Sequence, residues 1–114
     1  AVFVDDMYRI PMGRFGRMKM SHMIADTDDE LHAMADRIGV ARRWYQGDHY
    51  DIAVEAALAV EAGAIEVSKR QLGCMLFLRH RRLTMGDPAT APDRLRSAMA
   101  GGIPTRSRAT SNGL

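Results

Sequence analysis

The segment Thr27-Asp28-Asp29-Glu30-Leu31-His32-Ala33-Met34-Ala35-Asp36-Arg37-Ile38-Gly39 decides the fold class, because it predicts one helix with two defined ends. Thr27 and Glu30 have the spacing of a capping box, in which the two side chains satisfy backbone N–H groups that the first helical turn leaves free. Gly39 is a typical residue to follow the last helical turn. The apolar residues recur at helical spacing, at Leu31, Met34, Ala35 and Ile38. This spacing predicts one buried helix face, which must pack on another element.

Short apolar runs on both sides of this helix predict the strands of a sheet. They cover residues 2–4, 18–25 and 64–67. Two more helices are expected, over about residues 52–62 with Asp51 as N-cap, and from Ser68, where Ser68 and Gln71 form a second capping box. Residues 40–45 are ambiguous and could include a further short strand. Strands that alternate with helices predict a small single-domain α/β sandwich, with a short, partly parallel sheet flanked by helices.

Length and charge divide the chain into a compact part and a tail. A chain of 114 residues suffices for one domain, which we place at residues 1–82. Residues 83–114 are predicted to form a basic C-terminal extension, with one short helix over about 90–100 and a flexible tail. Residues 1–80 carry 10 Lys/Arg and 12 Asp/Glu (net −2), whereas residues 81–114 carry 6 and 2 (net +4). Such an extension could contact nucleic acid or a protein partner, or simply keep the protein in solution.

The composition favours a cytoplasmic protein without a membrane segment. The longest apolar run, residues 74–78, is far shorter than a membrane-spanning helix requires. The first residues lack the basic region and long apolar core of a signal peptide. The single cysteine, Cys74, stands among apolar residues and cannot form an internal disulfide. Each of these features is typical of a cytoplasmic protein.

The densest group of chemically active side chains is the segment Trp44-Tyr45-Gln46-Gly47-Asp48-His49-Tyr50-Asp51. Here Asp48, His49 and Asp51 are the candidate catalytic residues, because a histidine between two carboxylates can act as a positioned general base. Asp5, Asp6, His22 and His32 are the candidate metal ligands. Carboxylates combined with imidazoles suit a divalent cation such as Mg²⁺, Mn²⁺ or Zn²⁺.

The basic and aromatic residues suggest a substrate. The candidate substrate-binding residues are Arg14, Arg17, Lys19, Trp44 and Tyr50. The first three lie in a Gly/Pro-interrupted loop and could hold a phosphate, while the two aromatic rings could stack on a base. A bound divalent cation would activate water and neutralise phosphate charge. We therefore expect a metal-assisted phosphoester hydrolase, acting as a nuclease or nucleotide hydrolase.

Several short motifs together resemble a family of small bacterial and phage proteins that is known as a domain of unknown function. The motifs are Val4-Asp5-Asp6, Ser21-His22, Glu30-Leu31-His32, Ile38-Gly39, Gln46-Gly47-Asp48-His49-Tyr50-Asp51 and Gly63-Ala64. The resemblance covers about residues 2–72 and is specific in order and spacing. It implies a bacterial or phage cytoplasmic origin and brings no established activity.

Other interpretations of the same residues stay open. Trp44 and Tyr45 could fill the core, Asp48 and Asp51 could cap helices, and His49 could bond a backbone carbonyl. His32 could belong to a surface charge ladder with its aspartate neighbours four residues away on either side. At the level of function, the alternatives are a non-catalytic module that binds nucleic acid or protein, and a structural component of a phage or host complex.

Overall fold

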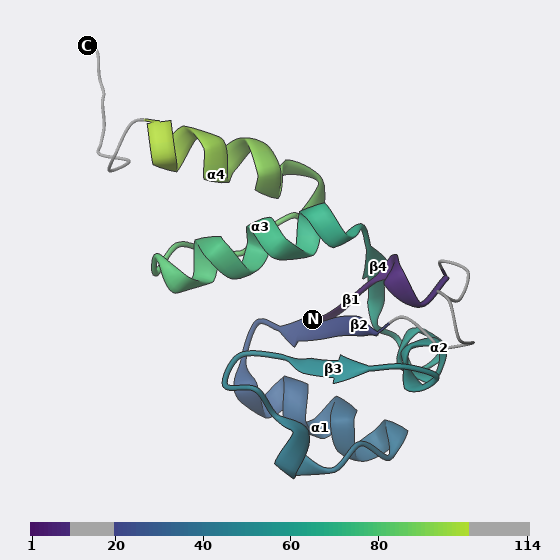
Figure 1. The fold of residues 1–114 in the computed structure, drawn as a ribbon. Helices are drawn as coiled ribbons and strands as arrows, with labels where there is room; N and C mark the ends of the chain where they lie inside the picture. Colours follow the sequence, from purple (N-terminus) through teal and green to yellow (C-terminus); the bar gives the residue numbers. More distant parts are fainter. Residues whose placement is uncertain (10–19, 101–114) are drawn as a thin grey trace.

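The computed structural model describes residues 1–9 and 20–100, and within them a four-stranded mixed sheet lies between two helical layers (Figure 1). The strands are β1 (Val2–Asp5), β2 (Ser21–Ala25), β3 (Tyr50–Ile52) and β4 (Ile65–Val67), in the spatial order β3-β2-β1-β4. β2 is antiparallel to β1 and β3, whereas β4 is parallel to β1. The predicted α/β class with a partly parallel sheet is confirmed.

The helices cover opposite faces of this sheet. They are α1 (Asp28–Ile38), α2 (Glu55–Glu61), α3 (Lys69–His80) and α4 (Ala91–Ala100). Short 3-10 helices lie at η1 (Asp6–Arg9), η3 (Arg42–Trp44) and η4 (Pro88–Thr90). One apolar cluster joins α1 and α2 to the sheet, and a second joins α3 and α4 to the other face. α4 packs on α3 and forms the outermost layer of that side (Figure 1).

Alternation along the strands decides which side chains meet which helices. Successive side chains of a strand point to opposite faces of a sheet. In β1, Val4 belongs to the cluster with α1, whereas Phe3 belongs to the cluster with α3. In β2, Met23 and Ile24 divide in the same way. The side chains of Asp5, His22 and Asp51 share the α3 side by this alternation, and that is where the candidate site forms.

The predicted helix ends are confirmed at both capping sequences, but the reciprocal capping box forms only at α3, because the Glu30 carboxylate of α1 pairs with the N-terminal amine of Ala1 at 2.7 Å. The Thr27 side chain accepts a hydrogen bond from the Glu30 N–H, and Gly39 ends α1 with φ of 83°, a conformation that favours glycine. At α3 the Ser68 side chain accepts from the Gln71 N–H while the Gln71 side chain accepts from the Ser68 N–H. Because these caps depend on neighbours in sequence, local reasoning identifies them correctly.

The region between α1 and α2 corrects two expectations. Asp51 does not cap a helix; it lies in the middle of β3, and α2 begins only at Glu55. Of the ambiguous residues 40–45, Arg42–Trp44 form η3, and Tyr45 makes only an isolated antiparallel bridge with Tyr50. The reason is tertiary: Tyr50 and Ile52 alternate with Asp51 and are buried against α1 and α2, while β2 pairs with all three residues.

Part of the C-terminal extension packs onto the compact domain. Ala91 and Leu95 of α4 join the apolar cluster of α3, so the predicted short helix is present and docked. Arg94 donates hydrogen bonds to the backbone carbonyls of Thr84, Met85 and Asp87. The Arg94 guanidinium, one of the positive groups of the extension, therefore holds the loop between α3 and η4. The predicted tail, residues 101–114, lies outside the described residues. No helix within residues 1–9 and 20–100 is long and apolar enough to cross a membrane.

Candidate metal centre

Three strands place an acid, a histidine and another acid in one row across the sheet. His22 of β2 is the register partner of Asp51 of β3. On its other side, the pairing of β1 with β2 brings Asp5 next to His22, with Nδ1 of the imidazole 2.9 Å from Oδ2 of Asp5. The order Asp5, His22, Asp51 thus follows from strand pairing between segments 17 and 29 residues apart in the chain.

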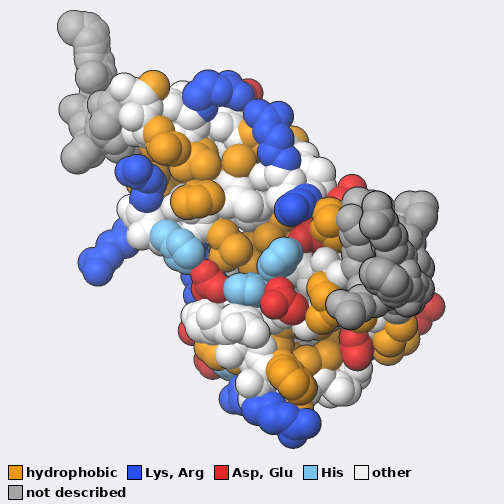
Figure 2. Space-filling model, viewed as in Figure 1, with side chains coloured by type: hydrophobic (Ala, Val, Ile, Leu, Met, Phe, Trp, Pro, Cys, Tyr) orange, Lys and Arg blue, Asp and Glu red, His pale blue; other side chains and the backbone are white. Residues whose placement is uncertain are grey.

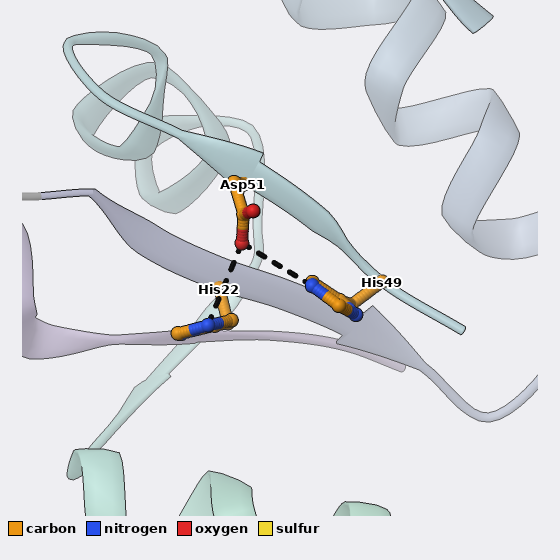
Figure 3. A group of neighbouring side chains, drawn as sticks. All are labelled: His22, His49 and Asp51. Atoms are coloured by element: carbon orange, nitrogen blue, oxygen red, sulfur yellow. Dashed lines mark ion pairs between the residues drawn. The ribbon is translucent and has the colours of Figure 1, made fainter. Parts of the chain in front are cut away.

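A second histidine joins this row from the turn before β3. The Gln46 N–H donates to the His49 carbonyl at 2.8 Å, and Gly47 has a φ of 95°, so a tight loop leads into β3. His49 and Asp51 are two residues apart and share one face. The Nε2 atoms of His22 and His49 lie 3.5 Å and 3.2 Å from Oδ1 of Asp51 (Figure 3). Both imidazoles therefore converge on one carboxylate oxygen.

Asp5 is the buried anchor of His22. Its side chain is 0 % exposed and accepts hydrogen bonds from the backbone N–H groups of Met7 and His22, each at 3.0 Å, besides its contact with the imidazole. Burial alone would raise the pKa of Asp5, but the hydrogen bonds from the His22 side chain and these N–H groups hold it below its ordinary value. The hydrogen bond with Asp5 in turn raises the pKa of His22, against the effect of burial.

Asp48 contacts Nδ1 of His49, as Asp5 contacts Nδ1 of His22. Its Oδ1 atom lies 2.5 Å from Nδ1 of His49, and its Oδ2 atom lies 2.6 Å from Nε2 of His80 at the end of α3. Burial alone would raise the pKa of Asp48, yet its hydrogen bonds with His49 and His80 lower it. The result is a continuous series of carboxylate and imidazole groups from β1 to the C-terminal end of α3.

The Asp51 oxygen on which both imidazoles converge has no hydrogen bond among the described residues. This atom, Oδ1, is buried. The nitrogens of His22 and His49 are within ion-pair range of this oxygen without hydrogen-bond geometry. One ligand atom from each of the three side chains lies within 4.8 Å of the others. This group, which we call the His22–His49–Asp51 triad, is the set of residues that could hold a cation.

A pocket of about 500 Å³ adjoins the triad. Asp51 is one of its lining residues, together with Arg43, Trp44 and Gln46 from the segment that follows α1. Figure 2 shows histidine and acidic side chains side by side in a band across one face of the molecule, between the two helical layers. The triad is thus open to solvent on one side while Asp5 lies beneath it in the interior.

Comparison with known proteins places the chain in a family. Residues 2–79 match the model of a family described as protein of unknown function DUF4031. The chain belongs to this family. No curated protein and no solved structure matches the chain. The match confirms the resemblance drawn from the sequence motifs and extends it from residue 72 to residue 79. All three residues of the triad lie within it.

The structure brings together five of the predicted site residues: Asp5, His22, Asp48, His49 and Asp51. Their contacts group them differently from the expected ligand and catalytic sets. Asp5, expected to be a metal ligand, instead bonds the far nitrogen of His22. His49 and Asp51, expected to be catalytic, stand with His22 as the potential ligands. The atoms that face one another are set by the strand register and not by the residue types alone.

His32 and Tyr50 require correction, because they lie on the other side of the sheet. Nδ1 of His32 is 2.7 Å from the hydroxyl oxygen of Tyr50, a residue of the apolar cluster with α1. Tyr50 is 0 % exposed and packs in the cluster with α1, so its ring offers no face for a substrate. His32 is therefore a partner of a core tyrosine and not a ligand beside His22. Strand alternation is the reason, since Tyr50 precedes Asp51 by one residue.

The remaining predicted residues divide by position. Trp44 is exposed and lines the pocket. Asp6 begins η1 and is not among the residues of the triad. Arg14, Arg17 and Lys19 lie outside the described residues. The residue that sequence analysis missed is His80. Its position in the last turn of α3 suits the helix dipole, and its contact with Asp48 depends on the packing of α3 over the sheet.

Proposed function

We propose that the chain is a hydrolase of phosphoesters that uses one divalent cation held by the His22–His49–Asp51 triad. The observation that carries this proposal is the buried Oδ1 atom of Asp51, which faces Nε2 of both histidines and lacks a hydrogen bond among the described residues. A buried carboxylate oxygen without a hydrogen bond is costly, and a cation shared with the two nitrogens would compensate for it.

The support for a metal includes the groups behind the ligands. Metal-binding histidines usually donate their second N–H to a carboxylate, which fixes the ring and leaves the other nitrogen free to bind. Both His22 and His49 have this arrangement, with Asp5 and Asp48 on their Nδ1 atoms. Two imidazoles and one carboxylate are a ligand set suited to Zn²⁺, Mn²⁺ or Fe²⁺, and three protein ligands leave room for water.

The competing explanation is a set of ion pairs between protonated histidines and aspartates. The two explanations differ in the state of the Nε2 atoms, which carry protons in the ion pairs and must lose them to bind a cation. Metal binding then releases protons and weakens as the pH falls. The raised pKa of His22 adds to this competition, because a proton is held more firmly on its imidazole.

The hydrolase part of the proposal follows from charge and access. A cation at the triad would lower the pKa of a bound water and neutralise a phosphate. Lys69, at the first turn of α3, is close enough to His22 to affect its pKa and adds positive charge at the same place. Asp48 and His80 lie at the exposed end of the network, where they could exchange protons with solvent. Lys69 would bind and orient the phosphate, and Asp48 and His80 would carry protons to and from solvent.

Calorimetric titration of the full chain with Zn²⁺ and with Mn²⁺ tests the metal site. We expect one cation per chain, and at least a tenfold weaker affinity in His22→Ala, His49→Ala and Asp51→Asn. The matched control is His32→Ala, which removes an imidazole from the opposite side of the sheet. Unchanged affinity in all three triad variants, or an equal loss in the control, would show that the triad is not the site.

Hydrolysis of bis(p-nitrophenyl) phosphate and p-nitrophenyl phosphate, with the cation and then with excess EDTA, tests the reaction. We expect hydrolysis that requires the cation and is lost in His49→Ala. Cation binding without hydrolysis of either probe would contradict the hydrolase and favour a non-catalytic binding module. Exposed Trp44, with the Arg43 guanidinium over its ring, is the observation that supports this second candidate.

A further inference from the structure

We propose that the pocket beside the triad binds the base of a nucleotide, with Trp44 as the stacking surface. This inference rests on the proposed function and names its substrate class. The pocket and the triad share Asp51, so a ligand in the pocket lies against one of the three potential cation ligands. Its volume of about 500 Å³ is in the range of sites for small organic molecules.

Trp44 is placed as a stacking residue and not as a core residue. Its side chain is 55 % exposed at the end of η3, although large aromatic rings usually contribute to the interior. The Arg43 guanidinium lies over the ring, 5.4 Å from its centroid, and this contact helps to hold the indole in position. Arg43 also lines the pocket and brings a positive charge suited to a phosphate. A ring and a cation side by side fit a ligand that has both a planar base and a phosphate.

Other pocket residues supply hydrogen-bonding groups for the edge of a base. The side-chain amide of Gln46 offers both donors and an acceptor. Glu55 accepts a hydrogen bond from the Ala53 N–H through one carboxylate oxygen, and its second oxygen is another acceptor in the same wall. These groups can pair with the edge of a base, and a phosphate or a sugar could also use them, but only a planar base can stack on the Trp44 ring in the same wall. The pocket therefore fits a nucleotide better than inorganic phosphate or a sugar phosphate.

The edge of β3 suggests a different occupant, which the experiment must separate from a nucleotide. β3 is the last strand of the sheet in the order β3-β2-β1-β4. Tyr45 makes an antiparallel bridge with Tyr50 on this edge, and an extended peptide could pair with the rest of it. Peptide pairing would depend on backbone groups of β3 and would not require a base. Stronger binding of ligands that have a base than of ligands without one therefore favours a nucleotide over a peptide as the occupant.

Trp44 is the one tryptophan of the chain, so its fluorescence reports directly on the pocket. The full chain, kept in EDTA so that no cation contributes, is titrated with adenosine 5′-monophosphate and cytidine 5′-monophosphate. Ribose 5-phosphate and inorganic phosphate are the controls without a base. We expect the nucleotides to quench the fluorescence at concentrations at least tenfold below those at which the two controls have any effect.

Variants show whether the indole itself binds the base. By calorimetry, we expect Trp44→Ala to weaken nucleotide binding about 5- to 150-fold, the range found for one stacked base, and Trp44→Phe to weaken it less. Phe77→Ala is the matched control, because Phe77 is a similarly exposed aromatic residue on α3 that does not line the pocket. Equal binding of nucleotides and ribose 5-phosphate, or unchanged binding in Trp44→Ala, would overturn the proposal.

The two proposals fail in different ways. His49→Ala removes a triad ligand and leaves the pocket walls in place, so we expect it to lose the cation and to keep base-dependent quenching in EDTA. Base-dependent quenching without cation binding in the original chain would reject the proposed hydrolase and keep the nucleotide pocket. Cation binding without base-dependent quenching would reject the nucleotide pocket and keep the cation site.

Discussion

Replacing Asp5 with alanine removes the buried carboxylate that anchors His22 of the triad. The side chain is 0 % exposed and accepts hydrogen bonds from the N–H groups of Met7 and His22 and from the imidazole of His22. In Asp5→Ala these donors lose their acceptor. The imidazole also loses the contact that orients Nε2 toward Asp51.

The size of the effect follows from the number of donors left behind. A buried donor without a partner costs about 1–3 kcal/mol, and both backbone N–H groups are partly buried, so water can replace some of the lost bonding. We therefore expect the free energy of unfolding to fall by about 2–4 kcal/mol. Loss of the carboxylate behind a metal-binding histidine usually weakens metal affinity about 10- to 100-fold, and we expect a decrease of that size here.

Urea unfolding followed by circular dichroism measures the free energy of unfolding, and calorimetry with Zn²⁺ measures the metal affinity. The control is Asp36→Ala, an exposed aspartate of α1, for which we expect a change within about 0.5 kcal/mol and unaltered metal affinity. If Asp5→Ala matched this control in both measurements, the buried carboxylate would not anchor the site and the reasoning from its hydrogen bonds would be wrong.

The pH dependence gives the same prediction an independent check. The pKa of Asp5 is lowered from 3.8, so its contribution to stability is present above that value and is lost as the pH falls through the folded-state pKa. The pKa of His22 is raised from 6.5, so its contribution is fully present below 6.5 and is lost as the pH rises through the folded-state pKa. The pair therefore stabilises the metal-free protein most between about pH 4 and 6.5. We expect Asp5→Asn to lose most stability relative to the original chain in this window.

Three further predictions concern the scaffold around the site; urea unfolding measures the stability in each, and calorimetry measures the metal affinity. Tyr50→Phe removes the hydroxyl bonded to His32 and should cost about 0.5–1.5 kcal/mol while leaving metal affinity unchanged; a loss of metal binding would contradict the placement of Tyr50 on the other face. Met75→Ala, at a 0 % exposed position of α3, should cost about 2–5 kcal/mol, and a change below 1 kcal/mol would show that α3 does not pack tightly on the sheet. Ser68→Ala removes the side chain that caps α3 through the Gln71 N–H and should cost about 0.5–2 kcal/mol, whereas no change would show that the cap does not contribute.

The sequence predicted the features that depend on near neighbours. The capping residues Thr27 and Ser68, the glycine after α1 and the strand before Asp5 are all correct, because a cap or a run of β-branched residues is a local property. It also predicted that Asp5 and His22 belong to one site. Both were candidate ligands by residue type, and the structure brings the two side chains into contact.

Tertiary structure decided the rest, and β3 shows why. Tyr50-Asp51-Ile52 has too little length to prefer a strand over a helix start, and only pairing with β2 makes it a strand. That pairing turns Asp51 toward His22 and Tyr50 toward α1, which makes one residue a candidate ligand and the other part of the core. Likewise, only the packing of α3 brings His80 to Asp48. The sequence by itself determined the α/β class, the caps and the types of residue at the site. Register and packing determined which atoms meet, because those contacts join segments that have no interaction until the sheet has formed.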